Sequence, residues 1–173
     1  MNLNILPGYS RSLAVAKLVK LLMVSGSLIM LDQISKMVIL RSMPMFEVFQ
    51  VIPGFFNITH IHNPGGAFGF MAAQGPEIRS LLFLAMSSLA AVVIVFFYLR
   101  TPAGYSWLST ALLLIFGGAI GNMIDRFRFR EVVDFLDFYA GGYHWPAFNV
   151  ADSGITVGMA ILVYHLLFDK MPE

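Results

Sequence analysis

Four long apolar stretches dominate the chain and predict four membrane-spanning helices. They cover residues 18–40, 80–99, 106–124 and 152–169, and each is close to the roughly 20 residues that a helix needs to cross a bilayer. The second and third stretches carry no charged side chain, and Arg100 ends the second. Pro102 and Gly104 then favour a tight hairpin between them.

The first stretch contains one acid and one base. Residues 1–16 are mixed in character, and we expect a short tail there that leads into the helix. Asp32 and Lys36 are four residues apart and lie on one helix face, acid before base, which is the more favourable order. Three interpretations are open. The pair is a buried ion pair that orients the helix, or the lysine extends to the lipid headgroups, or the pair supports a nearby active site.

A different pattern separates the first two spans. Pro and Gly residues punctuate residues 43–74, and the segments between them are rich in Phe, Val, Ile and Thr. We predict two short strands, at residues 46–52 and 55–61, followed by a Gly-rich loop. Irregular backbone exposed to lipid is not tolerated within a bilayer, so we expect this β segment to lie outside the membrane.

Composition supports one integral membrane domain over residues 1–173. The chain is 58% hydrophobic and 12% charged, with mean hydropathy +0.76, whereas soluble domains are roughly a quarter charged. We expect an all-α bundle of four spans with a small extramembrane β cradle between the first two. The net charge is +1 with no long basic run, which argues against a nucleic-acid partner. The absence of Cys excludes disulfides and thiolate chemistry.

Four spans place both termini on one side of the membrane, but charge does not say which side. Five Lys and Arg residues would lie on the side of the termini, and five would lie on the other. The positive-inside rule therefore decides nothing here. Residues 126–150 would form a loop on the side away from the termini.

Two acids at the ends of the last two spans are candidates for catalysis. Asp134 stands among bulky apolar neighbours after the third span, and Asp152 begins the fourth. Because the loop between them returns to the same membrane face, the two carboxyls can meet. Two adjacent carboxyls tend to share one proton. The ionised member can then take a proton from water while the other donates to a carbonyl oxygen, which is peptide hydrolysis without a metal.

Structural interpretations of these residues are equally direct. Asn149 and Asp152 fit a capping box with Asn149 as the N-cap, and Asp134 could be a surface acid after a helix. Asn122, Asp125 and Arg126 share one helix face by their spacing and could merely end the third span. The three arginines that follow, Arg126, Arg128 and Arg130, suit contacts with lipid phosphates.

Other classes of protein must also be considered. Intramembrane acids can form the proton path of a transporter or channel, but here the acids cluster at span ends. His60-Ile61-His62, with His144 and His165 elsewhere, could indicate a metalloenzyme. There is no HExxH sequence, and two histidines on one strand face are more typical of a polar surface. A structural membrane scaffold is a further alternative.

Several motifs together resemble the lipoprotein signal peptidases, the bacterial type II signal peptidases. They are Gly121-Asn122-Met123-Ile124-Asp125-Arg126, Val133-Asp134-Phe135, Phe148-Asn149-Val150-Ala151-Asp152-Ser153, the pair Asp32 and Lys36, and Asn63-Pro64-Gly65-Gly66-Ala67-Phe68. The last is similar to the family's Asn-x-Gly-Ala-Ala-Phe element, with Gly66 where the family often has Ala. The resemblance extends over residues 15–170.

The resemblance implies an aspartyl endopeptidase of the bacterial inner membrane. It would remove the signal peptide from prolipoproteins, on the N-terminal side of a Cys that carries diacylglycerol, and would work as a monomer among membrane lipids without a metal or cofactor. Asp134 and Asp152 would be the catalytic dyad. Asp125 would be structural, and the site would be lined or supported by Asn63, Gly65, Asn122, Arg126, Asn149, Asp32 and Lys36. The termini would be cytoplasmic, with the active site near the periplasmic face.

Overall fold

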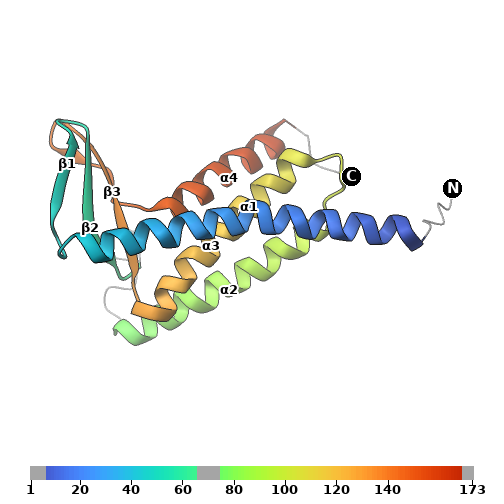
Figure 1. Cartoon of the computed structure of the whole chain (residues 1–173), viewed down its shortest axis with the longest axis horizontal. Helices are drawn as coiled ribbons and strands as arrows, with labels where there is room; N and C mark the ends of the chain where they lie inside the picture. Colours follow the sequence, from blue (N-terminus) through green and yellow to red (C-terminus); the bar gives the residue numbers. More distant parts are fainter. Residues whose placement is uncertain (1–6, 66–74, 169–173) are drawn as a thin grey trace.

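The computed structural model describes residues 7–65 and 75–168. Within these residues the chain forms four helices, α1 (Pro7–Ser42), α2 (Pro76–Arg100), α3 (Ser106–Phe129) and α4 (Val150–Leu167). It also forms four strands, β1 (Val48–Ile52), β2 (Phe56–Asn63), β3 (Val132–Ala140) and β4 (Tyr143–His144). Each helix is long and apolar enough to cross a membrane. The strands form one sheet in the order β1-β2-β3-β4 at one end of the helices (Figure 1).

The helices match the predicted spans, with longer ends. α1 begins at Pro7 rather than near residue 18, so the expected tail is wrong for residues 7–16. The run Leu13-Ala14-Val15-Ala16 continues the apolar helix, and proline is tolerated in a first helical turn. α3 continues to Phe129, five residues beyond the predicted end. It can do so because Asp125, inside that extension, pairs with Lys36 of α1. Residue 169, the predicted end of the fourth span, lies outside the described residues.

The sheet has two parts, of which the sequence predicted only one. β1 and β2 fall at the two predicted strands, and they pair antiparallel. The predicted loop over residues 126–150 is wrong, because it contains β3 and β4, and β3 pairs with β2. β3 is rich in β-branched and aromatic residues that suit a strand, and its Val133 and Phe135 are buried against Ile39 of α1. The cradle is therefore built from the segments after α1 and after α3. Residues 66–74 of the predicted β segment lie outside the described residues.

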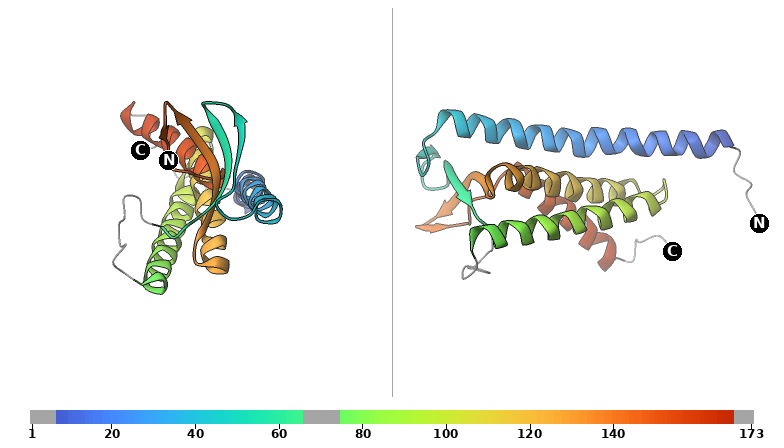
Figure 2. Two further views of the ribbon diagram at one scale, coloured as in Figure 1. Left: turned by 90° about the vertical axis from the view of Figure 1, so that its left-hand side faces the viewer. Right: turned by 90° about the horizontal axis from the view of Figure 1, so that it is seen from below.

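α3 is the central helix. It packs against α1, α2 and α4, and half of its span is buried, against 6% for α1. α1 runs along one side of the other three helices (Figure 2). Close approach depends on small residues. At Gly121, a Cβ atom would lie 2.7 Å from Asp32 Oδ2 and 3.1 Å from the Ala151 Cβ, so only glycine lets α1, α3 and α4 meet there.

The sheet lies where three helix ends converge. The Ser42 end of α1, the Phe129 end of α3 and the Val150 end of α4 all face it, whereas the other ends of α1 and α4 point away from it (Figure 1). The junction between the sheet and these three helix ends contains every acid that the sequence singled out. This junction is therefore the candidate location of the active site.

Candidate active site

One asparagine joins the two candidate catalytic acids. Asp134 lies on β3 with 2% of its surface exposed, and Asp152 lies in the first turn of α4. The Asn149 side-chain amide donates to Asp134 Oδ1 at 2.7 Å, and the Asn149 backbone N–H donates to Asp152 Oδ2 at 3.2 Å. The fold thus brings together two acids that are 18 residues apart in the sequence.

The capping interpretation of Asp152 is confirmed, and the cap uses only one of the two carboxylate oxygens. Asn149 Oδ1 accepts from the Asp152 backbone N–H at 2.9 Å, which completes a capping box with Asn149 as the N-cap. Only Asp152 Oδ2 is used for the cap. The other oxygen, Oδ1, accepts from the Asn122 amide at 2.7 Å. Capping α4 and facing the junction are therefore compatible roles for one side chain.

Asn63 and Gly65 bring the end of β2 to Asp134. The Asn63 amide donates to Asp134 Oδ2 at 3.0 Å, while Asn63 Oδ1 accepts from the Gly65 N–H at 2.9 Å. Gly65 has φ +87°, and a Cβ there would lie 2.6 Å from the Phe83 ring. Glycine is required for both reasons, and the turn that it permits fixes which end of the Asn63 amide faces Asp134. Gly66, Ala67 and Phe68 of the same motif lie outside the described residues.

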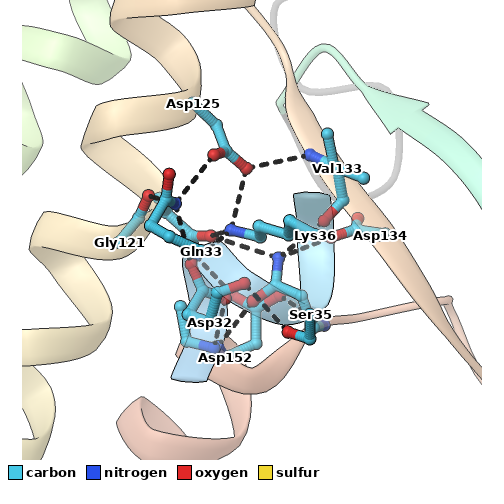
Figure 3. Close-up of polar contacts among 12 residues, drawn as sticks. Asp32, Gln33, Ser35, Lys36, Gly121, Asp125, Val133, Asp134 and Asp152 are labelled. Carbon is cyan, nitrogen blue, oxygen red and sulfur yellow. Dashed lines mark hydrogen bonds and ion pairs between the residues drawn. The ribbon is translucent and has the colours of Figure 1, made fainter. Parts of the chain in front are cut away.

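Lys36 is the centre of a buried ionic cluster (Figure 3). Its Nζ lies 2.8 Å from both Asp32 Oδ2 and Asp125 Oδ2, and it donates to Asn122 Oδ1 at 3.0 Å. Lys36 is 2% exposed, so the alternative in which it extends to the headgroups is wrong. Through Asn122, the cluster is one hydrogen bond away from Asp152.

The cluster also fixes the backbone on both sides of the two acids. Asp32 Oδ1 accepts from the Ala151 N–H at 2.9 Å, at the start of α4. Asp125 Oδ2 accepts from the Val133 N–H at 3.1 Å, just before Asp134. A carboxylate at a helix N-terminus is also favoured by the helix dipole. Asp125, which the sequence suggested to be structural, therefore holds the start of β3.

Gln33 is a member of this network that the sequence analysis missed. Its amide nitrogen lies 3.0 Å from Asp125 Oδ1, 3.1 Å from Asp32 Oδ2 and 3.2 Å from the Gly121 carbonyl oxygen. The available signal was a polar amide beside Asp32 inside an apolar span. Every carboxylate oxygen of Asp32 and Asp125 thus has at least one hydrogen-bond donor, as buried charges require.

The environment of Asp134 changes its protonation. Burial, and after it the negative charge of Asp152, raise the pKa of Asp134 to about 7 against the opposing effects of the Asn63 and Asn149 amides and of Lys36. Near neutral pH this carboxyl is therefore divided between its acid and ionised forms. A poised acid beside a second carboxyl can both donate and accept a proton, which is the requirement for general acid–base catalysis.

Arg126 lies beside this junction, toward α2. Its guanidinium carbon is 5.4 Å from the centre of the Phe83 ring, a cation–π contact. It also lines a cavity of about 320 Å³ together with Arg130, Phe127 and residues of α2. Arg130 pairs with Glu77 at 2.7 Å, so this guanidinium has an acidic partner within the protein.

Of the two histidines on β2, His60 is buried, so the expectation of a polar surface is wrong for it, whereas His62 is partly exposed. His60 is 6% exposed, and its Nε2 lies 3.2 Å from Nε2 of His62. In residues 7–65 and 75–168, no group of three or more histidine, cysteine or acidic side chains is arranged to hold a metal ion. The described part of the site accordingly offers carboxylates, amides and a lysine as its chemical groups.

Four apolar helices and two hydrogen-bonded acids, one buried and one partly buried, define a membrane protein with a paired-carboxylate centre. Residues 24–168 match the family described as "Signal peptidase (SPase) II". The chain belongs to this family, whose members are aspartyl proteases that remove signal peptides from prolipoproteins.

Relatives match over almost the whole chain. The chain is 55% identical over 156 residues to a lipoprotein signal peptidase of Desulforapulum autotrophicum, covering 90% of this chain and 96% of that one. It is 42% identical over 150 residues to a lipoprotein signal peptidase of Syntrophus aciditrophicus, covering 87% and 93%. A solved structure described as "Bacterial membrane enzyme structure by the in meso method at 2.3 A resolution" matches with a TM-score of 0.77 and 33% identity, covering 87% of this chain and 88% of that one. The family resemblance in the motifs is thus confirmed.

Proposed function

We propose that Asp134 and Asp152 are the catalytic dyad of this signal peptidase II and that they activate a water molecule between them. The observation that carries the proposal is the shared Asn149, which binds both carboxyls while the pKa of Asp134 stands at about 7. A pair of this kind keeps one proton at neutral pH. The substrate is a prolipoprotein, cut on the N-terminal side of its diacylglyceryl Cys.

The chemistry needs only this one proton and one water. The ionised carboxylate takes a proton from water as the water oxygen attacks the scissile carbonyl, and the protonated carboxyl donates to the carbonyl oxygen. Collapse of the tetrahedral intermediate breaks the C–N bond. The leaving nitrogen takes the proton from the pair while one hydroxyl of the intermediate gives its proton back to the pair, so the dyad again holds one proton. General acid–base catalysis of this kind contributes about 10²–10⁴-fold in rate.

Lys36 acts as a positioning residue in this proposal. A lysine ammonium can only donate, so its contact with Asn122 Oδ1 obliges the amide nitrogen of Asn122 to face Asp152. The ion pairs with Asp32 and Asp125 hold the ammonium in place. The cluster therefore sets the orientation of a hydrogen-bond donor at the dyad.

Arg126, Asn63 and Gly65 would contact the substrate. Arg126 lines the cavity of about 320 Å³ between α2 and α3, and the Asn63–Gly65 turn lies at the end of β2 beside Asp134. A substrate whose signal helix and lipid chains partition into the bilayer must enter sideways between helices. A cavity that opens between α2 and α3 suits such an entry.

The chain is a multi-pass protein of the inner membrane, and we infer the details of its placement. The four helices form a bundle within one domain over residues 1–173, which works as a monomer. Exposed apolar side chains on all four helices contact lipid. The sheet and the dyad lie near the periplasmic face, where water reaches the carboxyls, and the termini lie in the cytoplasm. The start of α1 and the end of α4 point away from the sheet (Figure 1), which supports a placement of the sheet and the termini on opposite sides of the membrane.

The decisive experiment is cleavage of a diacylglyceryl-modified prolipoprotein in detergent by the wild type and by Asp134→Asn and Asp152→Asn. We expect each variant to lose at least 100-fold in kcat/KM and EDTA to leave wild-type activity unchanged. The matched control is Asp137→Asn, a buried acid three residues further along β3 that pairs with His144. Near-normal activity in either dyad variant, or an equal loss in Asp137→Asn, would overturn the proposal.

A further inference from the structure

Two imidazole nitrogens point at each other on β2, outside the proposed dyad. His60 and His62 are two residues apart, so they share one face of the strand, and their Nε2 atoms are 3.2 Å apart. Asn63, whose amide contacts Asp134, is the next residue and alternates to the other face. The histidine pair therefore lies behind the part of the sheet that carries the site.

The outer nitrogen of each ring faces an oxygen that can only accept. His60 Nδ1 lies 2.8 Å from the Met43 carbonyl oxygen, and His62 Nδ1 lies 3.4 Å from Glu131 Oε2. Both partners favour a hydrogen on Nδ1, and a neutral imidazole with Nδ1–H carries its lone pair on Nε2. Two lone pairs then converge at 3.2 Å, and they repel each other unless a metal ion or a proton lies between them.

We propose that His60 and His62 bind a divalent transition metal ion, such as Zn²⁺, Ni²⁺ or Cu²⁺, between their Nε2 atoms. Metal–imidazole bonds of about 2.0–2.1 Å with angles between square and tetrahedral values separate two nitrogens by about 2.8–3.4 Å, and 3.2 Å falls in this range. Imidazole is a ligand that suits these metals. Water would complete the coordination on the more open side, where the His62 side chain is 17% exposed.

The partners of the outer nitrogens match the usual surroundings of metal-bound histidine. Such rings commonly donate their second N–H to a carbonyl or a carboxylate, which fixes the tautomer and makes the ligand more basic. Here Met43 follows α1, the rings belong to β2, and Glu131 precedes β3. An ion at this point would tie three segments together, so its role is structural and separate from the reaction at the dyad.

The test is calorimetric titration of metal-free, detergent-purified full-length protein with ZnCl₂ and NiCl₂, together with the EPR spectrum of added Cu²⁺. We expect one ion per chain, nitrogen hyperfine structure from two imidazoles, and a rise in the midpoint of thermal unfolding on adding Zn²⁺. His62→Asn should weaken binding at least tenfold, and Glu131→Gln should weaken it by about 10–100-fold, the usual effect of losing such a partner.

The control is His144→Asn, which removes an exposed histidine that pairs with Asp137 and should leave binding unchanged. Signal peptide cleavage should proceed in the metal-free protein, which separates this site from the dyad. Binding that is equally strong in His62→Asn would overturn the proposal. So would an absence of binding in the folded wild type, because the two rings would then hold a proton in place of a metal.

Discussion

α1 carries lysines toward both of its ends, and these lysines differ in burial and in partners. At the end remote from the sheet, Lys17 donates to the carbonyl oxygens of Leu99 and Thr101 at 2.6 and 2.9 Å, and Lys20 donates to the Ser106 carbonyl at 2.8 Å. Both are partly exposed. At the sheet end, Lys36 is buried and forms ion pairs with two carboxylates.

The difference lies in what burial does to a charge. A lysine near the headgroups keeps its ammonium hydrated while its stem covers apolar surface, so the contacts of Lys17 and Lys20 with the ends of α2 and α3 add modestly to stability. A buried ammonium without partners is strongly destabilising, so Lys36 can exist only with Asp32 and Asp125. Because these partners also hold Ala151 and Val133, the requirement for ion pairing fixes the geometry of the site.

The largest expected effect is the loss of the buried lysine. Lys36→Met leaves two buried acids facing each other without a cation, and we expect it to lower the free energy of unfolding by about 3–5 kcal/mol. Lys17→Met, the same change at the opposite end of α1, should lower it by less than about 1 kcal/mol. Denaturant titration in detergent measures both. Equal losses of unfolding free energy in the two variants would show that Lys36 and Lys17 contribute equally to stability, which would contradict this comparison.

The second effect is a pH dependence of stability that originates at the sheet end. An aspartate has a pKa of about 3.9 in the unfolded chain, whereas Asp134 has a pKa of about 7 in the folded protein. Between these values the unfolded state has released a proton that the folded state keeps, so stability falls as pH rises. The fall should total about 4 kcal/mol between pH 4 and pH 7, at about 1.36 kcal/mol per pKa unit, and then level off.

Unfolding measured across this pH range in two variants identifies the group responsible. Asp134→Asn removes the ionisable group and should flatten this part of the curve. Lys17→Met acts at the other end of α1 and should leave the slope intact. A slope that persists in Asp134→Asn would mean that another group is responsible.

The sequence was sufficient to predict the parts of the molecule that depend on local pattern. Four apolar stretches predicted four helices, and acids at the ends of apolar stretches singled out Asp134 and Asp152. β3 was missed because Asp134 and Asp137 interrupt its apolar pattern and suggested an exposed loop. Both acids are in fact buried, because Asn63, Asn149 and Asn57 donate to them.

Contacts that depend on how helices are rotated against one another could not be predicted. The sequence paired Lys36 with Asp32, four residues away, but Asp125 is its second partner only because Gly121 lets α1 and α3 approach. The same close approach of α1 and α3 brings Gln33 to Asp125. These are long-range consequences of packing, and no local spacing encodes them.

The third prediction separates chemistry from stability at Asp152. A capping box accepts Gln at the position of Asp152, so Asp152→Gln keeps the cap of α4 and removes the ionisable group. We expect kcat/KM to fall at least 100-fold, about 2.7 kcal/mol in activation free energy, while the midpoint of thermal unfolding stays close to that of the wild type. Asp152→Ala should lose the cap as well, with a further cost of about 1 kcal/mol in stability. Substantial activity in Asp152→Gln would return Asp152 to a capping role alone.

The smallest effect concerns the proton that the dyad shares. The Asn63 amide donates to Asp134 and lowers the pKa of that carboxyl, so Asn63→Ala should raise the pKa further. Since kcat/KM requires one proton on the pair, activity should decline above about pH 7 in the wild type. In Asn63→Ala the decline should shift to higher pH by about 0.5–1 unit, the worth of one hydrogen bond.

The control is Gln50→Ala, which removes a contact with Tyr139 on the same sheet and should not move the pH at which activity declines. A shift to lower pH in Asn63→Ala would mean that this amide stabilises the protonated form of Asp134, and the shared proton would then have to be assigned differently within the pair.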